Sequence, residues 1–193
     1  MKNKIILQIF GKKKVAALLL LCYLLWASLG LAGNKDEDKR RQLVGLSFFP
    51  NIIAVDEDIL AKRTQSGTLP LFFVYGNDRK NAEKMARRLK KKVKAIKKNP
   101  VEIKVTSELS PADKPVGIFL TEWLPDSEFD KIINFGIAHK IIVFSPFVGD
   151  VERGATAGLN ISTKIRPSLN LSTLKKSNIH INKVFMRLSK HYD

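Results

Sequence analysis

A loop between two glycines carries charged side chains that could contact a ligand. Residues 149–154 read GDVERG and place Asp150, Glu152 and Arg153 shortly after an apolar run, Ile141 to Phe144. Such a run is typical of a buried strand. A charged loop at the end of a buried strand would lie at the rim of an α/β sheet, where polar groups can line a binding site. The alternative is a plain connecting loop.

Two arginines are the best candidates for contact with an anionic group. Arg153 belongs to the charged loop, and Arg166 lies in the segment that follows it. A guanidinium presents two parallel donors, which match the oxygens of a carboxylate or a phosphate. The alternative is a surface salt bridge with Asp150 or Glu152, which would give the arginines a structural role.

Glu122 is a further candidate binding residue. It follows a second apolar run, Val116 to Leu120, and precedes Trp123. Because this run is also typical of a buried strand, Glu122 is expected at the rim of the sheet. There it could line a cleft and contact a ligand or a partner protein.

The sequence contains no recognisable catalytic or metal-binding set. Its three histidines lie far apart and lack the spacing of metal ligands; they are His139, His180 and His191. No serine lies in a nucleophile elbow, and no glycine series is followed by Lys-Ser or Lys-Thr. The acidic trio at residues 56–58 lacks the oxygen-rich spacing of a calcium loop. The sequence therefore predicts no enzyme, no cofactor and no metal, and favours a binding or signalling module.

Residues 1–32 have the pattern of a signal peptide. A basic segment without acids comes first, and an uncharged apolar run, Val15 to Ala32, follows it. The run ends in Gly30-Leu31-Ala32, a small-x-small pattern that predicts cleavage before Gly33. It is also just long enough to span a membrane, so a retained signal anchor is the alternative. Both interpretations predict a periplasmic location, either released or anchored to the inner membrane.

The net charge of the chain, +16, raises the question of a polyanionic partner. Much of the excess lies in residues 87–98, RRLKKKVKAIKK, whose helical spacing places Leu89, Val93 and Ile96 on one face. The lysines then form either a solvated face or a surface that attracts anionic lipids or an acidic partner. Nucleic acid is not expected, because the chain is exported and the segment lacks interleaved aromatic residues.

Alternating apolar and amphipathic segments predict an α/β fold. Helices and buried strands that alternate along a chain are typical of a mainly parallel central sheet with helical crossovers. Strands are expected at Leu69–Gly76, Val101–Val105, Val116–Leu120 and Ile141–Phe144, and helices at Arg79–Lys98 and Asp126–Ala138.

The two ends of the predicted domain are distinct. Residues 33–42 read as a charged linker, and residues 43–193 as one domain whose first segment is helical and bends near Pro50. Towards the C-terminus, residues 157–170 predict a β-hairpin with its turn at Ser162-Thr163. Two short helices, capped by Ser172-Thr173 and by Asn182, are expected after the hairpin.

Several of these segments resemble the YfiR/HmsC-type periplasmic proteins. The resemblance rests on the strand end FVYGND (Phe73–Asp78), the IIVFS strand with its glycine-containing loop, a hairpin that closes on Asn170, and LKKSNIHINKVFMRLSK near the C-terminus. It covers roughly Leu43 to Ser189. It implies an α/β regulator that binds the periplasmic part of an inner-membrane diguanylate cyclase and thereby controls cyclic di-GMP and biofilm formation. Family members with cysteine pairs sense redox state, which the mature chain cannot do because its cysteine, Cys22, lies in the leader.

Two other functional classes remain open. A periplasmic small-molecule-binding protein, resembling one lobe of an ABC-transporter solute receptor, would use the same rim of the sheet, although the domain is short for two lobes and a hinge. An exported hydrolase would need a nucleophile and base that the sequence does not show. Under the regulator hypothesis, the contact with an inner-membrane signalling protein includes Gly149–Gly158. The sequence is compatible with a monomer and with a homodimer.

Overall fold

The computed structural model describes residues 36–193, so the predicted signal peptide lies outside the described residues. The chain divides into two compact units, Met1–Arg40 and Arg41–Asp193, and the second contains the whole sheet. In that sheet the strands lie in the order β2-β3-β1-β4-β5-β6-β7-β8. The strands are β1 (Leu69–Val74), β2 (Ala95–Ile96), β3 (Asn99–Thr106), β4 (Gly117–Leu120), β5 (Ile142–Ser145), β6 (Ala157–Ile161), β7 (Ile165–Asn170) and β8 (Lys190–Tyr192).

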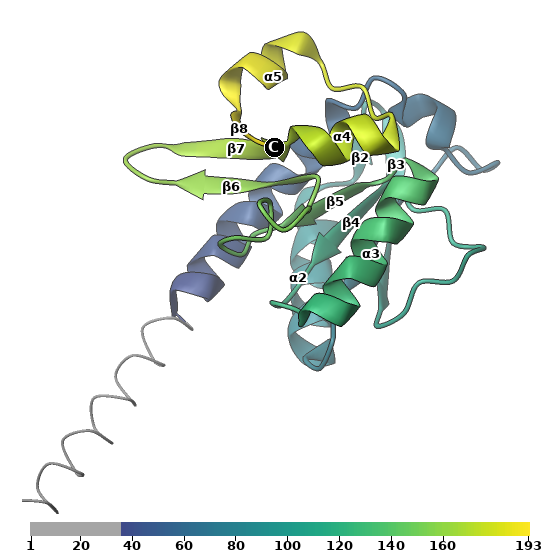
Figure 1. The fold of residues 1–193 in the computed structure, drawn as a ribbon. Helices are drawn as coiled ribbons and strands as arrows, with labels where there is room; N and C mark the ends of the chain where they lie inside the picture. The colour runs from purple at the N-terminus through teal and green to yellow at the C-terminus, as the bar shows by residue number, and fades with distance from the viewer. Residues whose placement is uncertain (1–35) are drawn as a thin grey trace, which may run out of the picture. The chain divides into compact units, whose positions relative to one another are not determined.

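The helices flank this sheet. Among the described residues, the first helix is formed by residues 36–54, and a short 3-10 helix, η1 (Ile59–Lys62), follows it. The other helices are α2 (Arg79–Lys92), α3 (Asp126–His139), α4 (Leu171–Ser177) and α5 (Lys183–Leu188). In Figure 1, α3 lies in front of the central strands and α2 lies behind them.

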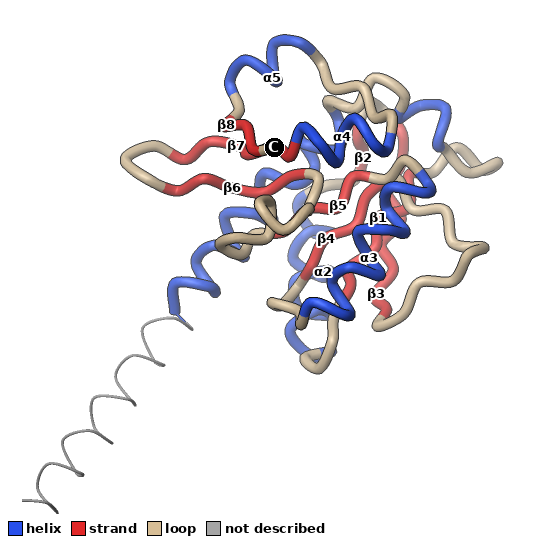
Figure 2. The backbone as a smooth tube through the Cα atoms, viewed as in Figure 1, coloured by secondary structure: helices blue, strands red, loops and turns tan. Residues whose placement is uncertain are grey.

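The centre of the sheet is parallel, as the alternation of strands and helices predicts. β1 pairs in parallel with β3 on one side and with β4 on the other, and β4, β5 and β6 continue the parallel arrangement. The antiparallel pair β6–β7 is the predicted hairpin, and it extends beyond the central strands (Figure 2). The single-domain α/β architecture with a mainly parallel sheet is therefore confirmed.

Each face of the sheet buries its own apolar layer. Successive side chains of β1 alternate between the layers, since Leu71 and Phe73 belong to one and Phe72 and Val74 to the other. The first layer includes the first helix and α2, and the second includes α3. This two-sided burial explains why the central strands read as continuous apolar runs rather than as alternating patterns.

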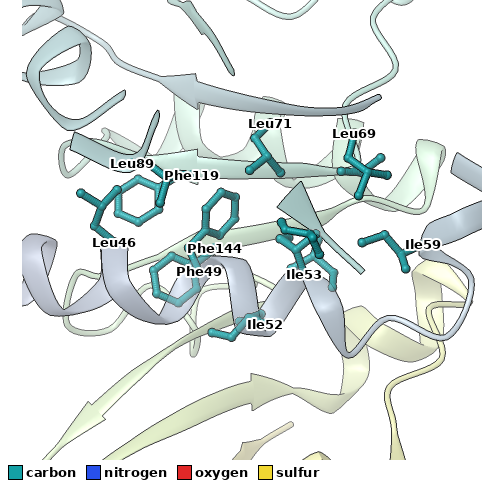
Figure 3. Close-up of a cluster of buried hydrophobic side chains, with 14 of the residues drawn as sticks. Leu46, Phe49, Ile52, Ile53, Ile59, Leu69, Leu71, Leu89, Phe119 and Phe144 are labelled. Carbon is teal, nitrogen blue, oxygen red and sulfur yellow. The ribbon is translucent and has the colours of Figure 1, made fainter. Parts of the chain in front are cut away.

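Phe49 of the first helix lies at the centre of the first layer (Figure 3). Its ring centroid lies 6.2 Å from that of Phe73, 5.3 Å from that of Phe119 and 5.8 Å from that of Phe144. Gly117 allows the helix to approach β4, because a Cβ there would lie only 2.3 Å from Ile53 Cδ1. The first helix is thus part of the core of the domain.

The predicted linker and the predicted bend at Pro50 are both corrected. Residues 36–42 are helical, and the helix continues through Pro50 to residue 54. Buried residues on both sides of the proline, Phe49 and Ile52, pack into the same layer, so tertiary burial offsets the donor that proline lacks. Arg41, within the predicted linker, is buried and donates to the backbone carbonyls of Pro146 and Leu159.

The predicted helix at Arg79–Lys98 is too long. Asp78 caps α2, but the helix ends at Lys92 and the chain turns into β2. Lys97 and Lys98 have φ values of 46° and 67°, which form the tight turn between β2 and β3. Lysine is not a typical turn residue, so the pattern of residues 87–98 predicted a helix where the structure has a turn.

The C-terminal segment contains two helices as predicted, but also a strand. Asn170, rather than Ser172-Thr173, caps α4, and Asn182 caps α5. β8 then adds to β7 in parallel, which local sequence does not predict because Lys190–Tyr192 is short and polar. Between residues 36 and 193, no helix has the length and hydropathy needed to cross a bilayer.

We expect Phe49→Ala to lower the free energy of unfolding by about 3–5 kcal/mol, because it removes a fully buried ring and leaves a cavity in the aromatic cluster. Chemical denaturation followed by circular dichroism measures this loss. Leu43→Ala is the matched control on the same helix: Leu43 is 45% exposed, and its loss should cost less than about 1 kcal/mol. Equal losses for the two variants would contradict the assigned core.

Candidate functional site at the carboxyl edge of the sheet

The strand order creates a switch point between β1 and β4. The chain leaves β1 through α2 and returns as β3 on one side of it, whereas β4 lies on the other side. In open α/β sheets, ligands bind in the crevice outside the carboxyl ends of such neighbouring strands. The loops after β1 and β4 are therefore the first place to look for a functional site.

Glu122 lies in this crevice and holds the loop after β1. One carboxylate oxygen, Oε1, accepts hydrogen bonds from the backbone N–H groups of Gly76, Asn77 and Asp78 at 2.8, 2.8 and 2.9 Å. Successive amides that point at one place form an anion-binding nest, and the positive end of the α2 dipole adds to the attraction. The chain fills this nest with its own carboxylate, so Glu122 fixes the loop.

Neighbouring contacts make the same corner rigid. The Asp78 side chain accepts from the Asn81 backbone N–H at 2.9 Å and so begins α2. Thr121 is buried, and its hydroxyl donates to the backbone carbonyl of Val74 at 2.9 Å, which ties β4 to β1. A side chain at Gly76 would crowd this corner, since a Cβ there would lie 3.0 Å from Leu124 Cδ2.

The buried Asp150 and the half-buried Arg153 form an ion pair next to this corner. Arg153 Nη1 donates to Asp150 Oδ1 at 2.7 Å, and the Ser145 hydroxyl donates to Asp150 Oδ2 at 2.5 Å. Burial raises the pKa of Asp150 above its ordinary value, while the hydrogen bonds from Ser145 and Arg153 act in the opposite direction. These contacts stabilise the loop after β5, to which Asp150 and Arg153 belong.

Arg153 also connects this loop to the start of α3. Its Nη2 donates to the Leu124 carbonyl at 3.1 Å and to Asp126 Oδ1 at 2.6 Å. The guanidinium carbon lies 4.1 Å from the centroid of the Phe129 ring and 5.2 Å from that of Trp123. Both terminal nitrogens of Arg153 thus donate to acceptors within the protein. Arg153 therefore positions the loop after β5 against the start of α3.

A cleft of about 640 Å³ opens beside the nest. Its lining is about equally polar and apolar, and the charged side chains at its surface are Glu108, Glu128 and Lys131. Within the described residues, no ion pair neutralises any of these three charges. The other lining residues are Val74, Tyr75, Gly76, Ser107, Leu109, Leu124, Ile132 and Phe135.

The structure brings three of the five sequence-predicted residues to this edge. Glu122, Asp150 and Arg153 lie there, but each makes internal contacts, and the expected Asp150–Arg153 salt bridge forms between a buried carboxylate and a half-buried guanidinium. Glu152 is exposed on the loop, and Arg166 is exposed on β7, where it pairs with Asn160 in the hairpin. Neither of these two joins the cleft.

Sequence reasoning missed the charged residues that do line the cleft. Glu128 and Lys131 lie three residues apart in the first turns of α3, so they share a face of that helix. Glu108 follows the end of β3, and Tyr75 follows the end of β1. The available signal was position: Glu108 lies just after a predicted strand, Tyr75 lies near the end of another, and Glu128 and Lys131 lie near the start of a predicted helix.

The histidines and acids do not converge. His139 Nδ1 contacts the Phe135 carbonyl, His180 contacts Asp58, and His191 contacts the Met186 carbonyl. In the part of the chain that the structure describes, no group of three metal-ligating side chains is close enough to hold an ion.

Comparisons with known proteins assign this chain to no family. No protein-family model matches the sequence, and a search among characterised proteins also finds no match. An ABC domain from Streptococcus pneumoniae, solved in complex with L-Trp, has a TM-score of 0.43 and 10% identity, and the match covers 72% of this chain and 61% of that one. A conserved domain protein from Vibrio cholerae O1 biovar El Tor N16961 has a TM-score of 0.48 and 16% identity, with 69% and 58% covered.

Neither similarity supports a conclusion about this chain. Both TM-scores lie below 0.5, and this chain spans about 61% and 58% of the lengths of the two matched chains. The resemblance to YfiR/HmsC-type proteins and the periplasmic location stay predictions.

We expect Glu122→Ala to lower the free energy of unfolding by about 2 kcal/mol, because three amides lose their charged acceptor. Hydrogen exchange of the amides of Gly76, Asn77 and Asp78 should accelerate in the same variant. Glu102→Ala, an exposed glutamate on β3, is the control and should change neither measurement. Unchanged exchange at the three amides in Glu122→Ala would show that Glu122 does not hold the nest.

Proposed function

We propose that this chain is a non-catalytic binding protein whose carboxyl-edge cleft holds a small amphiphilic molecule with an amino group. The supporting observation is the set of un-neutralised charges, Glu108, Glu128 and Lys131, around a cleft of mixed polar and apolar lining at the switch point. A volume of about 640 Å³ lies within the usual range for small-molecule sites.

The charges at the cleft define the class of ligand. Two carboxylates, Glu108 and Glu128, attract a protonated amine. The ammonium group of Lys131 can pair with a carboxylate of the same ligand. A zwitterion such as an amino acid satisfies both signs at once, whereas a simple dicarboxylate meets more repulsion than attraction.

The apolar lining favours a ligand with a hydrophobic side chain. Tyr75 and Phe135 contribute aromatic rings to the lining of the cleft, and Leu109 and Ile132 contribute aliphatic side chains. Burying an aliphatic or aromatic group there would gain about 25 cal/mol for each Å² removed from water. We therefore rank apolar and aromatic amino acids and related amines above sugars and simple anions.

A calorimetric titration series tests this proposal. We expect an apolar amino acid or its amine analogue to bind the wild-type protein and to raise its melting temperature. Glu128→Gln should weaken binding by about tenfold, because it removes a charge-assisted contact to the amine. Lys131→Gln should weaken the binding of amino acids but not that of the matching amines, which lack a carboxylate.

Asp130→Asn is the matched control, since this exposed acid lies on α3 between the two test positions but outside the cleft lining. It should leave every affinity unchanged. Absence of binding across amino acids and amines, or equal losses for Glu128→Gln and Asp130→Asn, would overturn the proposal.

A regulatory protein–protein contact is the second candidate function. The predicted contact loop, Gly149–Gly158, is largely buried, with Glu152 as its exposed side chain. The β6–β7 hairpin provides a better surface, because Ile161 and Ile165 form a cross-strand pair that is 37% and 46% exposed. Exposed apolar pairs at the end of a projecting hairpin are compatible with docking on another protein, such as the inner-membrane signalling protein that the YfiR/HmsC resemblance implies.

Affinity capture from solubilised membranes tests the second candidate. Full-length protein should retain a membrane signalling protein, and Ile161→Asp with Ile165→Asp should abolish that retention, because paired charges prevent apolar docking. Lys175→Asp on α4 controls for a change in charge alone. Identical capture by the double variant and the wild type would argue against the hairpin as the contact surface.

A further inference from the structure

A second cavity, of about 840 Å³, lies at the opposite, amino edge of the sheet. It is formed by η1 and the loop that follows, by the residues just before β4, and by the end of α3 with the start of β5. Its lining residues are Ala61, Lys62, Arg63, Thr64, Gln65, Ser66, Lys114, Pro115, His139 and Ile141. None of the functions discussed above uses this cavity.

The charge that lines the amino-edge cavity is entirely positive. Lys62, Arg63 and Lys114 contribute three cations, and no carboxylate is among the described lining residues. Lys62 is partly neutralised, because it pairs with the buried Asp56. Asp58, also near Lys62, is engaged with His180. The remaining positive charge is therefore carried by Arg63 and Lys114.

These two cations retain free donors. Within residues 36–193, no hydrogen bond or ion pair holds the Lys114 ammonium group. Arg63 uses Nε for the Leu60 carbonyl at 2.8 Å and Nη1 for Asn99 Oδ1 at 3.2 Å, which orients the guanidinium and leaves Nη2 without a protein acceptor. An oriented guanidinium with a spare donor is suited to binding an oxyanion.

The loop that follows Arg63, residues 64–68, is ordered by its own hydrogen bonds. The Thr64 N–H donates to the Thr68 carbonyl at 3.0 Å, and the Gly67 N–H donates to the Thr64 carbonyl at 2.9 Å. The Thr64 hydroxyl lies 2.9 Å from the Ser66 hydroxyl, while the backbone N–H groups of Gln65 and Ser66 have no acceptor among the described residues. Because the loop is already ordered, binding a ligand would cost it little conformational entropy.

We propose that the amino-edge cavity binds a small molecule through a phosphate group. The two free cations and the two unpaired amides give more donors than a carboxylate has oxygens, whereas a phosphate dianion can use them. The apolar side chains of Ala61, Pro115 and Ile141 line the rest of the cavity and favour a phosphate ester over inorganic phosphate.

Calorimetric titration of the full chain with phenyl phosphate and benzoate tests this proposal at constant ionic strength. The two compounds share a ring and differ in the charged group, so phenyl phosphate should bind at one site at least tenfold more tightly than benzoate. Lys114→Gln and Arg63→Gln should each weaken phenyl phosphate by about tenfold, in line with loss of one charge-assisted contact.

Lys84→Gln is the matched control, because Lys84 is an exposed lysine of α2 and does not line the cavity. It should leave the affinity unchanged, and so should Glu128→Gln at the carboxyl edge. Since Lys114 supports no protein contact, its variant should keep the wild-type melting temperature. An equal loss for Lys84→Gln, equal binding of benzoate, or no binding of phenyl phosphate would overturn the proposal.

Discussion

The burial of the central strands on both faces is the constraint on which the remaining structure depends. β1, β4 and β5 carry apolar side chains that point alternately into two layers, so neither face can be left to water. The first helix and α2 must cover one face and α3 the other. Phe49, in contact with three aromatic rings from three strands, shows how closely the first helix is integrated into this arrangement.

A parallel sheet built in this way has two chemically different edges. Loops after the strands meet at the carboxyl edge, and loops before the strands meet at the amino edge. In this protein the carboxyl edge carries Glu108, Glu122 and Glu128 with Lys131, whereas the amino edge carries Arg63 and Lys114 without a lining acid. The separation of charge follows from placing acidic residues in one set of loops and basic residues in the other.

Internal hydrogen bonds of charged side chains shape the carboxyl edge before any ligand is present. Glu122 supplies the negative charge that the amides at the start of α2 attract, and Arg153 links the loop after β5 to the start of α3. Each of these side chains satisfies backbone groups that would otherwise lack partners. The cleft beside them can therefore keep its shape, while Glu128 and Lys131 remain un-neutralised at its surface.

The sequence by itself determined the class of fold and the order of the main elements. Apolar runs at the positions of β1, β4 and β5, separated by amphipathic segments, are local signals, and so are the caps at Asp78 and Asn182. Local signals were insufficient where distant residues decide the outcome. The turn at Lys97-Lys98 and the helix through Pro50 exist because β3 and the aromatic cluster stabilise them.

The identity of the site residues was likewise only partly contained in the sequence. Position after a buried strand was enough to place Glu122 and Asp150 at the rim of the sheet. Only the tertiary structure decided that Glu122 binds amides 44–46 residues away and that Asp150 is buried against Ser145 and Arg153. Hydrogen-bond partners are set by the pairing of strands that are remote in the chain, and no local pattern records that pairing.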